Sequence, residues 1–138
     1  MNTLRRACSK EAWVVQTSEQ FNRALIAKDF GQIAEFYDPV ALMTHKPGQS
    51  YLGRDDIACF WKKWFATYAQ PAFGNILKVS VKDQQAGYVD SYLSYDRGRG
   101  LIMKEHWLLN DNGSAQLVYH TLSLVGLTAK PVNYGQIA

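Results

Sequence analysis

Cysteine, histidine and long apolar runs are all scarce in this sequence of 138 residues. The two cysteines, Cys8 and Cys59, lie far apart, so buried or idle free thiols are favoured over a disulfide. No stretch approaches the roughly 20 apolar residues that span a bilayer. The first residues are not followed by the apolar core of a signal peptide. We therefore predict a cytoplasmic protein with no membrane partner.

A strong charge imbalance is also missing. The chain has 15 Lys and Arg against 12 Asp and Glu, a net charge of +3, and the basic residues are scattered along the sequence. Nucleic-acid binding is therefore not expected. A hydrophobic share of 47% is typical of a folded chain, and this length suits one domain better than two. We predict one domain over residues 1–138, with a core over about 9–125 and a tail over 130–138.

The stretch FYDPVALMTHKPGQSYLGRDDIACFWKKWF, residues 36–65, predicts a helix end, a hairpin and an amphipathic helix. The helix must stop at Asp38-Pro39, because the residue before a proline is pushed out of the helical region. An apolar strand over 40–44, a turn over 46–49 and a return strand over 50–52 follow. After Gly53, apolar residues fall on one helical face: Ile57, Phe60, Trp61, Trp64, Phe65 and Tyr68.

Two further helices are predicted before this stretch. The first begins with Ser9 as its cap or, alternatively, with the capping box that starts at Thr17; the earlier start is favoured. It ends near residues 28–31, and a short helix runs from Gly31 to Tyr37. Gln70-Pro71 then breaks the helical pattern.

Beyond residue 75 the apolar period changes from 3.6 to 2. Strands are predicted over 76–82, 87–95, 101–109 and 114–125, joined by a loop over 96–100 and a turn over 110–113. In the first of these strands, Leu77, Val79 and Val81 share the inward side. The sequence therefore predicts an α+β fold, with three N-terminal helices packed against a strongly curved mixed β-sheet.

Three ionisable side chains are predicted to point inward from strands. Glu105 shares its face with Met103 and Trp107, His120 shares its face with Leu122, and His45 follows Met43 at the same parity. A carboxylate and two histidines in an apolar concavity are typical of a general acid-base site, because burial and mutual hydrogen bonding can move the pKa values of such groups toward neutral pH.

Structural interpretations of the same residues stay open. A single inward histidine is equally well a hydrogen-bonded core residue. Glu105 could form a structural pair with Lys or Arg, or a bulge could invert the parity of its strand. Asp90 points outward at the parity that we favour. The three candidates lack a dense ligand motif, so no metal site and no cofactor are predicted.

The order of these elements resembles a known family. The pattern FY-D-x-strand-turn-x-GR-D-x-I-x-x-F-W is similar to that of the nuclear transport factor 2-like superfamily. These cone-shaped α+β barrels include ketosteroid isomerases, SnoaL-like cyclases, limonene epoxide hydrolase and scytalone dehydratase. The resemblance covers roughly residues 9–125 and implies the same cone.

The resemblance to ketosteroid isomerase implies roles for individual residues. His45 falls, with a one-residue gap, where that enzyme has its aspartate base, and Glu105 falls where it has the protonated aspartate of the oxyanion hole. Tyr37 and Trp61 match two pocket tyrosines. Phe21 matches the tyrosine of the oxyanion hole but cannot donate a hydrogen bond. Steroid isomerisation by that mechanism therefore does not follow.

Two functions are predicted as alternatives. The first is an isomerase, cyclase or dehydratase, with hydrolase chemistry less favoured, in which His45 is the base, Glu105 the acid or orienting group, and His120 their partner. Its hydrophobic substrate would contact a cone wall made of Phe21, Tyr37, Met43, Trp61, Met103 and Trp107. The second is a non-catalytic module that binds an apolar ligand or a protein partner, favoured if Trp61 and Trp107 plug the cone.

A homodimer is the last prediction. Outward positions of the late strands carry more apolar surface than a solvated sheet should expose: Ile102, His106, Leu108, Leu117, Tyr119, Thr121 and Val125. Members of the superfamily often pair through this face, and the resemblance implies the same here.

Overall fold

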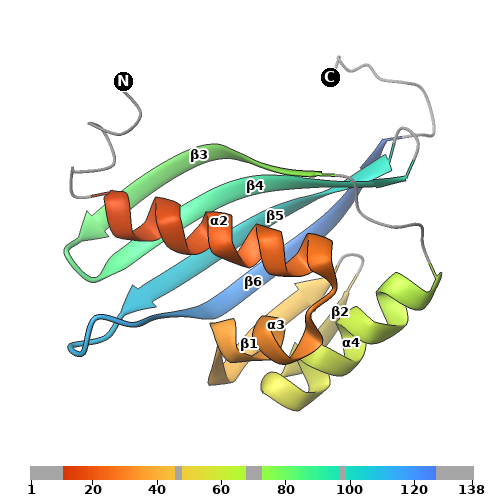
Figure 1. Ribbon diagram of the computed structural model, residues 1–138, viewed down its shortest axis with the longest axis horizontal. Coiled ribbons are helices and arrows are strands. Elements are labelled where there is room, and N and C mark those ends of the chain that lie inside the picture. Colours follow the sequence, from red (N-terminus) through yellow and green to blue (C-terminus); the bar gives the residue numbers. More distant parts are fainter. Residues whose placement is uncertain (1–10, 46–47, 68–72, 97–98, 127–138) are drawn as a thin grey trace.

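The computed structural model describes residues 11–45, 48–67, 73–96 and 99–126 (Figure 1). The elements, in chain order, are α2 (Ala12–Ala27), α3 (Phe30–Phe36), β1 (Tyr37–His45), β2 (Gln49–Leu52), α4 (Arg54–Thr67), β3 (Phe73–Asp83), β4 (Ala86–Asp96), β5 (Arg99–Leu109) and β6 (Ala115–Gly126). The predicted α+β fold with three N-terminal helices is confirmed. Predictions for Cys8, Ser9, Lys46-Pro47, Tyr68, Gln70-Pro71, residues 97–98 of the predicted loop and the tail over 130–138 lie outside the described residues.

Helix α2 begins before Thr17, so the later of the two predicted starts is wrong, while Ser9 lies outside the described residues. Its N-cap is Glu11, and Thr17 lies inside the helix, where its hydroxyl donates to the carbonyl of Trp13 at 2.7 Å. The helix stops at Lys28, which adopts a left-handed conformation with φ of 57°. Asp29 then caps α3 by accepting the N–H of Gln32 at 3.2 Å.

Helix α4 buries the face that the apolar spacing predicts. Ile57, Phe60, Trp61, Trp64 and Phe65 are all buried. Asp55 and Asp56 occupy its first turn, where the helix dipole stabilises carboxylates. The apolar face of α4 therefore packs against the core. Its polar residues lie on the surface or face strands β1 and β2.

The sheet is mixed and has the order β2-β1-β6-β5-β4-β3. All its pairs are antiparallel except β1 with β6. Strands β2 and β3 are its two edges and do not pair with each other over the described residues, so the sheet is open. Helix α2 crosses one face of the sheet, and α3 and α4 lie at the end formed by β1 and β2 (Figure 1).

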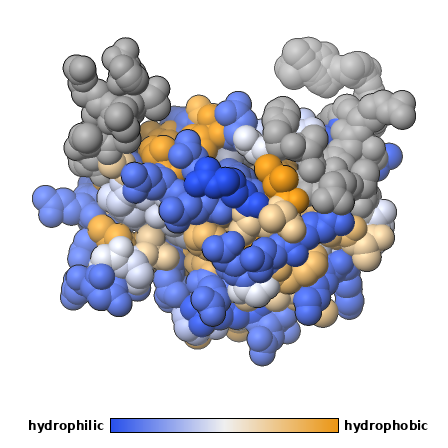
Figure 2. Space-filling view, in the orientation of Figure 1, coloured by the Kyte–Doolittle hydropathy of each residue, from blue (hydrophilic) through white to orange (hydrophobic). Residues whose placement is uncertain are grey.

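The surface on the helix side is mainly hydrophilic (Figure 2). This is expected of amphipathic helices whose apolar faces are turned to the sheet. Among the helices of the described ranges, none is long and apolar enough to span a membrane.

Two side-chain directions were predicted wrongly because the strands contain β-bulges. The register of β3 shifts between Ile76 and Lys78, which leaves Leu77 54% exposed and packs Ile76 against the core. In β6, Tyr119 pairs with His106 but Leu117 pairs with Trp107, so Val118 is an extra residue. Leu117 therefore points into the core instead of outward. An extra residue in one strand reverses the faces of the residues on one side of it.

Strand boundaries differ from the predictions by a few residues. Strand β1 begins at Tyr37 and includes Pro39, with a register shift between Tyr37 and Leu42 that accommodates the proline. Strand β5 begins at Arg99 instead of Leu101, so part of the predicted loop is strand.

Candidate functional site

Glu105 lies at the centre of a buried hydrogen-bond cluster that joins α2, β4 and β5. Its carboxylate accepts from Ser18 Oγ at 2.7 Å and Trp107 Nε1 at 2.8 Å on Oε1, and from Ser91 Oγ at 2.6 Å on Oε2. Its exposed fraction is 2%, and its parity is inward as predicted. Among the described residues, its three hydrogen-bond partners are neutral donors, not a Lys or Arg.

The environment of Glu105 acts on its pKa in two directions. Burial raises the pKa to about 7, because the ionised carboxylate is poorly solvated there. The hydrogen bonds from Ser91, Trp107 and Ser18 oppose this effect, and the negative charge of Asp90 adds to it. The carboxyl group is therefore poised between its neutral and charged forms near neutral pH.

His120 belongs to a second buried cluster. Its Nδ1 lies 2.7 Å from the hydroxyl of Tyr37, which also accepts a hydrogen bond from Trp61 Nε1 at 3.1 Å. The other possible acceptor of the phenolic proton is the sulfur of Met43 at 3.8 Å, and an imidazole nitrogen is the better acceptor. We therefore assign the phenolic proton to the bond with Nδ1, and the imidazole proton to Nε2.

Full burial keeps His120 neutral. It lowers the pKa of His120 to about 3 and raises the pKa of Tyr37 well above its usual value. The Nε2 atom of His120 is buried and has no hydrogen-bond partner in the described part of the chain. Glu105 and His120 are paired in register on β5 and β6, yet no hydrogen bond joins their side chains.

His45 lies at the end of β1, against helix α4. Its ring contacts those of Phe60 and Trp64 at centroid distances of 5.5 and 5.4 Å. Partial burial lowers the pKa of His45, and a hydrogen bond with Gln49 opposes the shift. Its Nε2 atom is covered and unpartnered within the described residues.

The six predicted wall residues belong to the packed core of the protein. Their exposed fractions are all 0%: Phe21, Tyr37, Met43, Trp61, Met103 and Trp107. The ring of Phe21 meets those of Tyr37 and Trp107 at 5.7 Å and that of His120 at 5.5 Å. A side chain with no accessible surface borders no water-sized space, so a substrate would reach this wall only if the core opened. Their role in binding stays a prediction.

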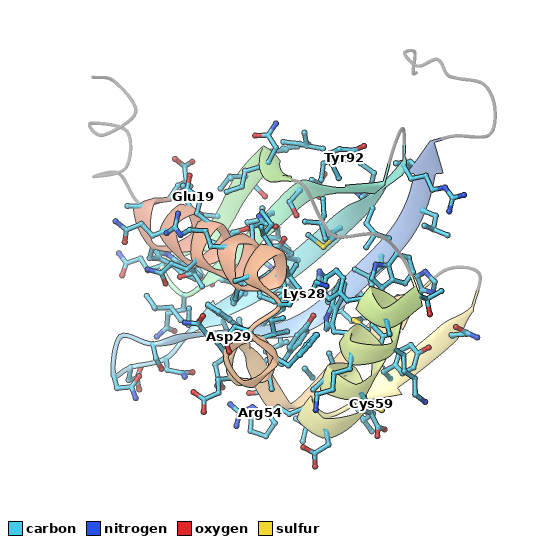
Figure 3. All side chains as sticks on the ribbon, turned by 45° about the vertical axis from the view of Figure 1, so that its right-hand side comes forward. Glu19, Lys28, Asp29, Arg54, Cys59 and Tyr92 are labelled. Atoms are coloured by element: carbon cyan, nitrogen blue, oxygen red, sulfur yellow. The ribbon has the colours of Figure 1, made fainter. Side chains whose placement is uncertain are left out.

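A groove lies between α4 and the β1–β2 hairpin, with a volume of about 440 Å³. It is lined by His45, Gln49, Tyr51, Asp56, Cys59, Phe60, Lys63, Trp64 and Thr67. Cys59 is labelled on α4 in Figure 3, where the hairpin runs beside this helix. Of the three predicted catalytic residues, only His45 lines the groove; Glu105 and His120 do not.

Sequence reasoning missed most of this groove. Asp56, Cys59 and Lys63 are spaced three and four residues apart, so they lie on one side of α4. The buried aromatic residues Phe60 and Trp64 lie next to them on the helix. The spacing was visible in the sequence, but only the sheet topology shows that this side of α4 faces the hairpin. No cluster of metal-ligating side chains occurs among the residues that the structure describes.

Comparison of the sequence with family models gave no match, and no curated protein matches it. Solved structures do match. A ketosteroid isomerase-like protein from Erwinia carotovora atroseptica has a TM-score of 0.74 and 12% identity, over 86% of this chain and 98% of that one. A nuclear transport factor 2-like protein of unknown function from Burkholderia xenovorans has a TM-score of 0.63 and 17% identity, over 94% and 95% of the two chains.

A third similar structure carries a ligand. It is a protein from Catenulispora acidiphila in complex with S-DNPA, with a TM-score of 0.66 and 14% identity over 82% of this chain and 91% of that one. The chain therefore has the fold of the nuclear transport factor 2-like superfamily, as the resemblance implied. Identities at this level establish the fold and leave the activity to the residues of the site.

Proposed function

We propose that this protein binds a small molecule with an apolar body in the groove between α4 and the β1–β2 hairpin. The observation that carries the proposal is the groove itself, because its volume of about 440 Å³ lies in the range of small-molecule sites. Tyr51, Phe60 and Trp64 supply aromatic surface, and His45 and Gln49 supply hydrogen-bonding groups. The dense packing of the six predicted wall residues supports this binding role over catalysis in the interior.

A substitution that fills the groove tests this proposal. Cys59 is exposed and lines the groove, so Cys59→Trp should occupy the space without disturbing the core. Ala66→Trp adds the same side chain to an exposed position of α4 that does not line the groove. The probe is the neutral dye N-phenyl-1-naphthylamine, whose fluorescence rises in apolar surroundings.

The wild-type protein and Ala66→Trp should bind the dye with equal affinity, whereas Cys59→Trp should bind it about tenfold more weakly or not at all. Circular dichroism and the melting temperature serve as folding controls. Equal dye binding by Cys59→Trp and Ala66→Trp would contradict the proposal.

A second candidate function is proton transfer by His45, Glu105 and His120. The observation in its favour is that the Nε2 atoms of His45 and His120 are buried and have no hydrogen-bond partner among the described residues. Such orphaned polar atoms are rare in native proteins, and a group that exchanges a proton with a substrate once the core opens would account for them. Glu105→Gln should then shift the titration of one histidine followed by NMR. If neither histidine responds, this function fails.

We also propose a homodimer formed through the outer face of the sheet. Its support is the exposed aromatic and aliphatic surface of Tyr88, Leu108 and Tyr119, which are 36%, 38% and 42% exposed. Sedimentation at micromolar concentration should give twice the chain mass of 15.6 kDa. Tyr119→Glu should return the protein to monomer, whereas Leu77→Glu, at an exposed position of the edge strand β3, should not. A wild-type protein that sediments only as a monomer would exclude this dimer.

A further inference from the structure

The groove has one negative and one positive end. Helix α4 contributes Asp56 and Lys63 to its lining. These residues are seven positions apart, which corresponds to two helical turns and about 10 Å along the axis. Their neighbours Asp55 and Lys62 do not line the groove. Each groove charge therefore has an adjacent residue of the same type as a matched control.

The two charges are not equally balanced by the protein. Asp56 lies in the first turn of α4, where the positive end of the helix dipole stabilises a carboxylate. Lys63 has no acidic residue three or four positions away on its helix, and it forms no ion pair with a described residue. Within the described residues, the positive charge at the Lys63 end of the groove is therefore the one that lacks compensation.

Among the described residues that line the groove, Asp56 is the only other charged side chain, and it lies two helical turns from Lys63. Trp64 follows it in the sequence, and His45, whose ring contacts Trp64, is kept neutral by its lowered pKa. An anion placed here would face Lys63 and meet no competing negative charge nearby, while Asp56 would repel it from the opposite end. The ligand would therefore bind in one orientation.

We propose that the ligand of this groove is a small aromatic or other apolar molecule that carries one anionic group, held by Lys63. The inference rests on the proposed binding function and adds the charge and the orientation of the ligand. The anionic group is a carboxylate, a sulfonate or an ionised hydroxyl, all of which offer oxygen acceptors to an ammonium donor. The apolar body lies against Tyr51, Phe60 and Trp64.

A pair of matched dyes tests the charge of the ligand. The probes are 1-anilinonaphthalene-8-sulfonate and N-phenyl-1-naphthylamine, which has the same ring system without the sulfonate. Lys63→Met should weaken binding of the anionic dye about two- to fivefold, the range for an accessible ion pair, relative to its effect on binding of the neutral dye. Lys62→Met should change neither affinity. Added salt should weaken binding of the anionic dye but not of the neutral dye. This salt effect should be lost in Lys63→Met.

A second pair of variants tests the orientation. At low ionic strength, Asp56→Asn should tighten binding of the anionic dye by up to about twofold, and Asp55→Asn should have a smaller effect. Equal responses of Lys63→Met and Lys62→Met, or equal loss of both dyes in Lys63→Met, would overturn the inference. The binding function itself would still stand if Cys59→Trp abolished binding of the neutral dye. If Cys59→Trp changed the binding of neither dye, both the proposed function and this inference would be wrong.

Discussion

The contribution of the buried carboxyl group of Glu105 to the stability of the protein should depend on pH in an unusual direction. In the folded protein its pKa is raised from 4.5 to about 7. Because the folded state holds this proton more tightly than the unfolded state, the protonated form stabilises the fold. That contribution is complete below pH 4.5, decreases as the pH rises, and is lost once the pH passes the folded-state pKa near 7.

The size of the effect follows from the shift of the pKa. Each pKa unit corresponds to about 1.4 kcal/mol, so the contribution of Glu105 to the free energy of unfolding should fall by ~3 kcal/mol between pH 4.5 and 7. Two hydroxyl donors make both protonation states possible, since Ser18 and Ser91 can reverse their hydrogen bonds. Trp107 can only donate, and it donates to Oε1, so we expect the proton on Oε2.

His120 acts in the opposite direction. Its pKa is lowered from 6.5 to about 3, so the unfolded state takes up a proton that the folded state does not. Its contribution to stability is complete above pH 6.5 and is lost as the pH falls. Between about pH 4.5 and 6.5 the contributions of Glu105 and His120 change at equal and opposite rates. In the free energy of unfolding of the wild-type protein the two contributions therefore cancel in this pH range. A comparison of the wild type with a variant that lacks one group separates them.

Glu105→Gln provides this comparison, because glutamine keeps the shape of the side chain and removes its titration. The free energy of unfolding should be measured with urea for wild type and variant at pH values from 4.5 to 8. The advantage of the wild type over the variant should shrink by ~3 kcal/mol from pH 4.5 to 7 and then stay constant. Ser114→Ala, in the exposed 110–114 turn, should give a difference that does not vary with pH. A constant difference between wild type and Glu105→Gln would refute the reasoning.

Two substitutions probe the packing of the interior. Phe21→Tyr adds a hydroxyl group to a fully buried ring and should destabilise the protein by about 1–3 kcal/mol in urea unfolding, whereas an unchanged stability would indicate open space beside this ring. Gly87→Ala should cost a similar ~1–3 kcal/mol, because its Cβ would lie 2.8 Å from Cγ2 of Val14. Gly31→Ala, in α3, places a Cβ in ordinary contact with Asp29 Oδ1 at 3.9 Å and should instead stabilise the protein by about 0.5–1 kcal/mol. A loss of stability there would show that the helix geometry is misjudged.

The sequence predicted the fold well wherever a local pattern decided the structure. The apolar spacing of α4 and the parity of Met103, Glu105 and Trp107 on β5 are both confirmed. The failures at Leu77 and Leu117 have one physical cause, since a bulge depends on the register with a neighbouring strand and leaves no mark in the hydrophobic pattern of a single strand. Alternation alone could not locate either bulge.

The candidate site was less predictable than the fold. Strand parity gave the inward directions of Glu105 and His120, but it could not show that neutral donors such as Ser18, from a helix 87 positions away in the sequence, would surround the carboxylate. The groove depends on how α4 lies against the hairpin, which is a tertiary relation. Local sequence patterns identify which residues are available for a site, and the packing of distant elements decides which of them meet.

The parallel pairing of β1 with β6 has a consequence for how the chain folds. Strand β1 and its hairpin partner β2 are joined to the rest of the sheet only through β6, and β1 and β6 are separated by all the intervening strands and by α4. During synthesis, the hairpin and the groove beside it therefore have no sheet to dock on until residues 115–126 have left the ribosome. Contacts of such long sequence separation form slowly. An early-emerging apolar hairpin that waits for a late strand is the segment most exposed to mispairing or to chaperone binding.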